Sequence, residues 1–202
     1  MMALALASAP GWALAADTAK PPVAKPAAAA ATAAAPSAAR LVPASSEVTF
    51  TAKQLGVPLD GRFKRFDAQI ALDPRQPQTG KVAFQIELGS VAINAETDAE
   101  LAQATWFNTG KFPKATFVSS GIKAVGAGKF EVAGTLTIKG QAKPLVVPVS
   151  LAQSAGTTTA TGAFAIKRLD FKIGDGDWAD PSVVANDVQV RFKLTLQGLA
   201  PL

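Results

Sequence analysis

The amino-acid sequence predicts an all-β domain in which about eight antiparallel strands close into a barrel, interrupted by one short helix. Three observations support this fold. From Leu41 onward, apolar and polar residues alternate with a period of two in segment after segment. Turn-forming residues separate the segments by links that are mostly of hairpin length. Each segment is apolar on one face only, and a closed barrel leaves no free sheet edge, whereas two stacked sheets would.

The strands are predicted where the alternation is clearest, and their apolar residues share one face. They are 47–52, 65–72, 81–88, 130–139, 145–151, 160–166 and 187–196. The residues that separate them are Asp73-Pro74, Gln78-Thr79-Gly80, Gly126-Ala127-Gly128, Lys139-Gly140-Gln141 and Ala155-Gly156-Thr157. Several of the runs are long enough to build a wall on the order of 30 Å tall.

The single predicted helix covers about residues 95–106. Asn94 is a suitable N-cap, and Glu96, Asp98 and Glu100 place negative charge near the positive end of the helix dipole. These carboxylates are spaced two apart, so they do not share one helix face, and a catalytic acid–base pair is not indicated.

The N-terminal part is not expected to belong to the folded domain. Residues 1–15 are apolar, too short to span a bilayer as a helix, and end in the cleavage-site pattern Ala13-Leu14-Ala15, which predicts a signal peptide and export to the periplasm. Residues 16–40 are rich in Ala and Pro, which predicts a disordered linker. The folded domain is therefore expected at 41–202.

The composition excludes several kinds of chemistry. The chain has no Cys, His or Tyr, so thiolate nucleophiles, disulfides, His-based triads and zinc sites with N/S ligands are ruled out. The loop 174–182 resembles a calcium loop but lacks the Glu that should close it, so no metal site is predicted. We find no catalytic motif and expect neither an enzyme nor a cofactor. Of the net charge of +5, only a net +3 falls after residue 40, where it is spread along the strands, and nucleic-acid binding is not expected.

The inward faces of the strands are the candidate ligand-binding wall. They mix bulky Phe with small residues such as Ala68, Gly134 and Gly162, which leaves two interpretations open: a hollow barrel with one apolar ligand, or a filled core. The predicted wall residues are Phe50, Phe66, Ile70, Phe84, Ile86, Phe117, Val132, Leu136, Val147, Phe164, Ile166, Val190 and Phe192.

Four groups of residues, in this order, resemble the YceI family. They are Gly61-Arg62-Phe63 with Phe66 before Asp73-Pro74; Phe107 with the segment 112–117 and Ser119-Ser120; the segment 134–140 with Lys143-Pro144; and Arg168, Asp170-Phe171 and Gly174 before Asp187-Val188. The resemblance covers about residues 41–198. It implies an extended eight-stranded lipocalin-like barrel that encloses a polyisoprenoid or similar amphiphile, with no catalytic activity established for the family as a whole.

The ligand is accordingly expected to be an isoprenoid or quinone-like lipid. An anionic head group would favour cations at the barrel mouth. The candidates are Arg62, Lys64 and Arg65 in one cluster and Arg168 in a second, with Lys167 and Lys172 beside it; the alternative interpretation of each cluster is a solvated hairpin end. Trp106, Phe107 and Phe112 are expected to form a lid over the mouth or a plug that closes one end. The alternative function is a filled barrel that acts as a structural or interaction module, with an inner-membrane or envelope protein as its partner.

Overall fold

The computed structural model describes residues 38–202. The expected signal peptide and the linker up to residue 37 lie outside the described residues. The first strand, β1, starts at Ala38, three residues before the expected start of the domain at residue 41. The end of the Ala-rich segment therefore contributes to the sheet.

The described chain forms one antiparallel sheet and one α-helix. The bounds are β1 (Ala38–Leu41), β2 (Glu47–Gln54), β3 (Val57–Phe63), β4 (Phe66–Ala71), β5 (Lys81–Glu87), β6 (Val91–Ala92), α1 (Ala95–Leu101), β7 (Lys114–Gly126), β8 (Lys129–Ile138), β9 (Gln141–Ser154), β10 (Thr157–Lys167) and β11 (Asp187–Gln197).

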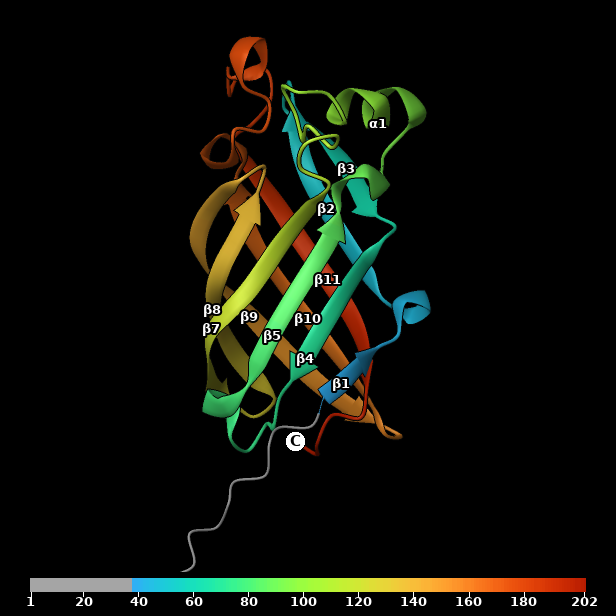
Figure 1. Cartoon of the computed structure of the whole chain (residues 1–202), viewed down its shortest axis with the longest axis vertical. Helices are drawn as coiled ribbons and strands as arrows, with labels where there is room; N and C mark the ends of the chain where they lie inside the picture. The colour runs from blue at the N-terminus through green and yellow to red at the C-terminus, as the bar shows by residue number, and fades with distance from the viewer. Residues whose placement is uncertain (1–37) are drawn as a thin grey trace, which may run out of the picture. The chain divides into compact units, whose positions relative to one another are not determined.

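These strands form a closed eight-stranded barrel (Figure 1). We call each of the eight positions around its wall a stave. Three of the staves are each made of two consecutive strands. A short 3-10 turn, Pro43–Ser45, separates β1 from β2, and both halves pair with β11. Likewise β4 continues β3, and β6 continues β5. Arg40 closes the ring, since it pairs with Gln69 on one side and Gln197 on the other. The predicted eight-stranded all-β barrel is confirmed.

The helix has the predicted N-cap but is shorter than predicted. Asn94 accepts a hydrogen bond from the backbone N–H of Thr97 at 2.9 Å. The helix ends at Leu101, so its predicted extension to Trp106 is wrong. The chain instead turns there, with the backbone N–H of Phe107 donating to the carbonyl of Leu101 at 2.9 Å. This turn directs Trp106 and Phe107 into the barrel end, where both are buried.

The two ends of the barrel differ in how they are closed. The upper end in Figure 1 carries α1 and the loop segments that follow β10, and a buried cluster that includes Leu88, Phe107, Phe171 and Val184 fills it. The lower end carries the C-terminus and the β7–β8 and β9–β10 hairpins. A second buried cluster, which includes Leu41, Val48 and Leu196, belongs to this end.

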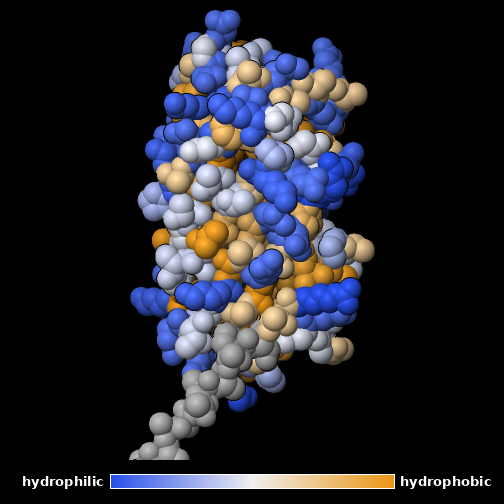
Figure 2. Space-filling view, viewed as in Figure 1, coloured by the Kyte–Doolittle hydropathy of each residue, from blue (hydrophilic) through white to orange (hydrophobic). Residues whose placement is uncertain are grey.

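On the face of the outer wall shown in Figure 2, hydrophilic side chains are spread over the surface, and apolar side chains show between them, most of all in the lower half. Among the described residues, no helix is both long and apolar enough to cross a bilayer.

Candidate functional site: an apolar cavity in the barrel

An apolar cavity lies inside the barrel. The cavity volume is about 140 Å³, which is below the roughly 300–1,000 Å³ of a typical ligand pocket, and the wider space around it, which includes open solvent, is about 1040 Å³. Its lining comes from every stave of the barrel. All lining residues are apolar except Thr116, and the lining contains no ionisable side chain among the residues described.

Ten of the predicted wall residues line this cavity. They are Ile70, Phe84, Ile86, Phe117, Val132, Leu136, Val147, Phe164, Val190 and Phe192. Several of them are only half-buried although they point inward, among them Phe84, Leu136 and Phe192. In a filled barrel these side chains would be fully buried. Their remaining exposed area therefore faces the lumen, and this favours the hollow barrel over the filled core.

Three predicted wall residues do not line the cavity. Phe50 lies in the plug at the upper end, where its ring centroid is 5.4 Å from that of Phe63. Ile166 packs against the same plug, because it lies near the upper end of β10. Phe66 begins β4 directly after a kink, and its ring packs on Phe84 with 5.9 Å between centroids.

Other lining residues were not in the predicted set. They are Val48, Leu72, Val82, Ala115, Thr116, Ile122, Phe130, Val149, Leu151, Ala160, Leu194, Leu196 and Leu199. For most of them the period-two alternation carried the necessary signal, since they share the inward face with predicted neighbours. Leu199 had no such signal. It follows the last strand, and only the tertiary structure places it at the lower end of the cavity.

Glycines on the inner wall leave room for two phenylalanine rings to lie close to the backbone. A methyl group on Gly162 would overlap the ring of Phe192, its partner across β10 and β11. A methyl group on Gly134 would overlap the ring of Phe117 and the carbonyl oxygen of Val118. Each ring therefore occupies the space that a side chain would take. The small residues in the alternation thus explain how a Phe-rich wall leaves a lumen.

We expect Gly134→Ala to lower the free energy of unfolding by about 1–3 kcal/mol, because the added methyl group forces the ring of Phe117 to move and strains the β7 backbone. Gly121→Ala is the matched control, since a methyl group there would meet nothing within 4 Å. Urea denaturation of both variants measures the difference. Equal stability of the two variants would show that Phe117 does not rest on Gly134.

Arg168 was predicted as a head-group contact at the mouth, and the structure contradicts this. Its side chain is 2 % exposed. Its guanidinium donates to the carbonyl oxygens of Ile173, Gly174, Trp178, Val184 and Ala185, at distances between 2.6 and 3.2 Å.

Arg168 therefore organises the segment that closes the upper end. No carboxylate lies within 4 Å of it among residues 38–202. Burial lowers the pKa of Arg168 below its usual value, but an arginine remains protonated in proteins, and backbone carbonyls compensate its charge. No donor remains for a lipid head group.

The aromatic residues expected near the mouth form part of the plug. Trp106 and Phe107 are buried, and the Trp106 ring lies 5.5 Å from that of Trp178. Within the described residues, the buried Nε1 of Trp106 has no hydrogen-bond partner. Phe112 is half-buried beside the β8–β9 turn, where its ring approaches Gly140 and lies 5.4 Å from Nζ of Lys111. Of the two interpretations, lid and plug, the plug is correct for Trp106 and Phe107.

Lys139 is a second buried cation in this plug. Its Nζ donates to the carbonyl oxygens of Lys172 at 2.6 Å and Thr105 at 3.3 Å, and lies 3.7 Å from a carboxylate oxygen of Asp175. Lys139 thereby links the β8–β9 turn to the loop that contains Thr105 and to the loop that contains Lys172. This role of Lys139 could not be predicted from the sequence, since a lysine beside a glycine in a turn is usually solvated.

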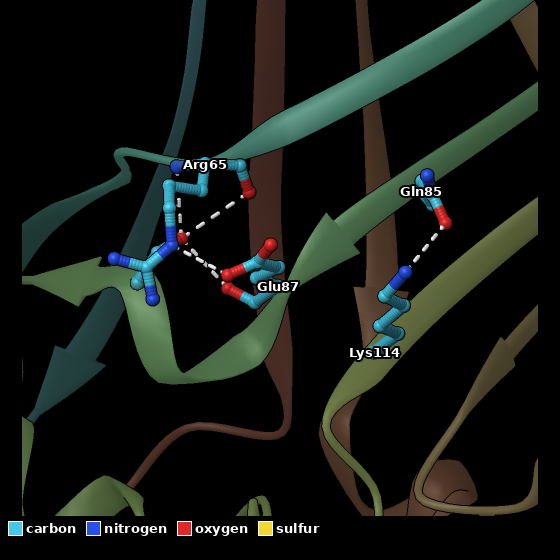
Figure 3. Close-up of polar contacts among 5 residues, drawn as sticks. Arg65, Gln85, Glu87 and Lys114 are labelled. Atoms are coloured by element: carbon cyan, nitrogen blue, oxygen red, sulfur yellow. Dashed lines mark hydrogen bonds and ion pairs between the residues drawn. The ribbon is translucent and has the colours of Figure 1, made fainter.

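The remaining predicted head-group cations lie on the outer wall. Arg62, Lys64 and Arg65 are exposed, and none lines the apolar cavity. Arg65 forms an ion pair with Glu87, and beside it Lys114 donates to the side-chain oxygen of Gln85 at 3.1 Å (Figure 3). Exposed pairs of this kind contribute about 0–1 kcal/mol. The cluster is therefore a solvated surface rather than a mouth.

The acidic loop 174–182 is a set of turns. The backbone N–H and hydroxyl of Ser182 donate to Asp180 at 2.8 and 2.7 Å, and these hydrogen bonds, the hydroxyl one first, lower the pKa of Asp180. Within residues 38–202, no three acidic side chains come together as a metal site would require.

The model of the YceI-like domain matches residues 40–196. The chain belongs to the YceI family. The YceI resemblance of the four residue groups is thereby confirmed.

Among the relatives of this YceI-family chain is Protein YceI of Salmonella arizonae, which is 38 % identical over 106 residues; the match covers 52 % of this chain and 55 % of that protein. The chain thus spans about half the length of the curated relatives it matches. The crystal structure of Burkholderia cenocepacia BcnA is similar with a TM-score of 0.75 and 40 % identity, over 77 % of this chain and 98 % of that one.

A more distant structural neighbour shares the fold. It is described as a polyisoprenoid binding domain from Saccharophagus degradans implicated in plant cell wall breakdown. The TM-score is 0.65 at 18 % identity, over 80 % of this chain and 99 % of that one. At this identity the similarity establishes the YceI-like barrel alone.

Proposed function

We propose that this YceI-family domain is a binding protein that holds a polyisoprenoid or a similar long apolar lipid inside the barrel. The observation that carries the proposal is the cavity, which every stave of the barrel lines with apolar side chains and which contains no ionisable group among the described residues. Such a wall can bind hydrocarbon but offers no group for acid–base or nucleophilic chemistry. A neighbour with the same fold is described as polyisoprenoid-binding, and this supports the same class of ligand.

The affinity is expected to come from buried apolar area. Each buried methylene contributes about 0.8 kcal/mol, and part of this gain is offset by the loss of freedom on binding. The rings of Phe117 and Phe192, which approach Gly134 and Gly162 and line the cavity, offer apolar area to a branched, unsaturated chain. The head group then lies where the chain leaves the barrel, because the lining offers no charged partner for it.

We also propose that the protein acts in the periplasm, on the basis of the apolar segment 1–15 and its Ala13-Leu14-Ala15 pattern. Osmotic-shock fractionation of cells that express the full chain tests this directly. Recovery in the periplasmic fraction, without residues 1–15, is the expected result, and recovery of the unprocessed chain in the cytoplasm would contradict the proposal.

A chain-length series tests the lipid ligand. Delipidated protein is titrated with geraniol, farnesol, geranylgeraniol and solanesol. We expect saturable binding that tightens by at least about tenfold per added isoprene unit, until the chain exceeds the length of the lumen and the affinity levels off. Absence of saturable binding for the whole series would favour the alternative, a barrel that acts through an envelope protein partner.

A further inference from the structure

The wall of the barrel is unpaired along one seam. Strands β9 and β10 pair from Ser154 and Thr157 up to Val149 and Gly162, and no pairing joins them above this point in the described chain. Beyond it, residues 141–148 pair only with β8, and residues 163–167 pair only with β11. The 3-10 turn Arg168–Phe171 approaches β9 at the upper end of the seam.

Two prolines account for the place where the pairing ends. The backbone N–H of Leu151 donates to Gly128, on the side away from β10, while the hydroxyl of Thr161 reaches the carbonyl of Ser150, on the side of β10. Backbone groups alternate along a strand, so the even-numbered residues of β9 face β10. Pro148 and Pro144 have no N–H to offer there, and the ladder stops below Pro148.

The cavity reaches this seam from the inside. Val147 of β9 and Phe164 of β10 both line it, and they lie on opposite flanks of the seam. The outer rim between the exposed Lys143 and Lys167 is apolar as well. Val146 is 54 % exposed, and Pro144, Pro148, Ala163 and Ala165 are exposed around it.

Both ends of the barrel are less suitable as an entrance. The buried aromatic plug fills the upper end, and Arg168 and Lys139 bind its loops through their buried cationic groups. At the lower end Leu199 lines the cavity, and the C-terminal segment is fixed by two hydrogen bonds of Gln153, to Ala200 at 2.8 Å and from Leu202 at 2.9 Å. Opening either end would break these contacts, whereas the seam can open without loss of strand pairing.

We propose that the seam between residues 141–148 and 163–167 is the lateral entrance through which the lipid reaches the cavity. This inference rests on the proposed lipid-binding function. The lipid slides in sideways between Val147 and Phe164, and its head group stays outside. The apolar rim around Val146 contacts the hydrocarbon chain as it passes, so the chain does not cross a polar surface.

The test is to lock the seam with a covalent bridge. The chain has no natural Cys, so Val146→Cys with Ala165→Cys places two thiols at exposed positions on opposite flanks, and a short bis-maleimide links them. The matched control is Val146→Cys with Ala133→Cys, whose residues are partners in the paired β8–β9 seam. Mass spectrometry confirms each bridge. The readout is the rate at which delipidated protein takes up tritiated geranylgeraniol from phosphatidylcholine vesicles.

We expect the locked seam to slow uptake by at least about tenfold and the control bridge to leave the rate within about twofold of the unbridged protein. Equal uptake by the locked and control proteins would overturn the lateral entrance while leaving lipid binding intact. If the unbridged protein takes up no geranylgeraniol, the proposed function itself is wrong, and the entrance falls with it.

Discussion

Replacing Arg168 by methionine is expected to lower the free energy of unfolding by about 3–5 kcal/mol, which is the largest loss of stability that we expect from a single substitution in this barrel. The guanidinium of Arg168 serves five backbone carbonyls of the segment that closes the upper end. Methionine fills a similar volume but donates no hydrogen bond. Its introduction leaves buried acceptors such as Ile173 and Gly174 without their partner.

Urea denaturation followed by tryptophan fluorescence measures this loss, because Trp106 and Trp178 lie in the same plug. Arg191→Met is the matched control: Arg191 is exposed on the outer wall, and we expect a change within about 0.5 kcal/mol. If both variants unfold at the same urea concentration, Arg168 does not hold the plug together.

The second large effect is expected for Leu136→Trp, which should weaken geranylgeraniol binding by at least about tenfold while costing less than about 1.5 kcal/mol of stability. Leu136 lines the cavity and is only half-buried, so the indole can extend into empty space. There it occupies volume that the lipid needs. Binding titration and urea denaturation of the same preparation measure the two quantities.

Leu196→Trp is the comparison that separates a hollow from a filled barrel. Leu196 also contributes to the lining, but it is only 2 % exposed and is packed in the lower buried cluster. The larger ring has no free space there, and we expect a loss of stability of about 1–3 kcal/mol or more. Equal destabilisation by the two substitutions would mean that the space beside Leu136 is filled in the folded protein.

Most of the fold could be predicted because it depends on a local pattern. Period-two alternation marks which residues face inward, and closure removes the free edges that such strands would otherwise leave. The kinks that divide three staves were not predicted. One of these kinks is the turn Pro43–Ser45. The strands before and after it both pair with β11, and this pairing is a property of the tertiary structure. The end of the helix at Leu101 was likewise set by the burial of Trp106 and Phe107 in the plug.

The wall of the candidate site was largely predictable, and the ends were not. Ile70, Phe84 and Phe192 follow from alternation alone, but alternation does not tell where along a strand the lumen gives way to the plug, as Phe50 and Ile166 show. The clustering of cations along the sequence did not predict where the mouth of the barrel lies. Arg168 proved to be buried among backbone carbonyls, and Arg65 lies on the outer wall in an ion pair with Glu87. The burial of Arg168 and the ion pair of Arg65 both depend on which residues lie close together in the folded chain.

The two prolines that end the β9–β10 pairing are visible in the sequence, but only the strand register shows which neighbouring strand they affect. Pro144 and Pro148 are four residues apart within a strand, so their missing N–H groups face the same side. Which side this is depends on the pairing of Pro148 with Glu131 in β8. The neighbour that loses its pairing is therefore β10.

Lipid binding inside the barrel is tested most directly by native mass spectrometry of the protein after export to a bacterial periplasm and purification without detergent, with organic extraction of any bound molecule. The expected result is a discrete adduct whose fragments are those of an isoprenoid chain. A clean mass of the unliganded chain, unchanged after incubation with octaprenyl and quinone lipids, would contradict it and identify the barrel as a module that acts without a lipid.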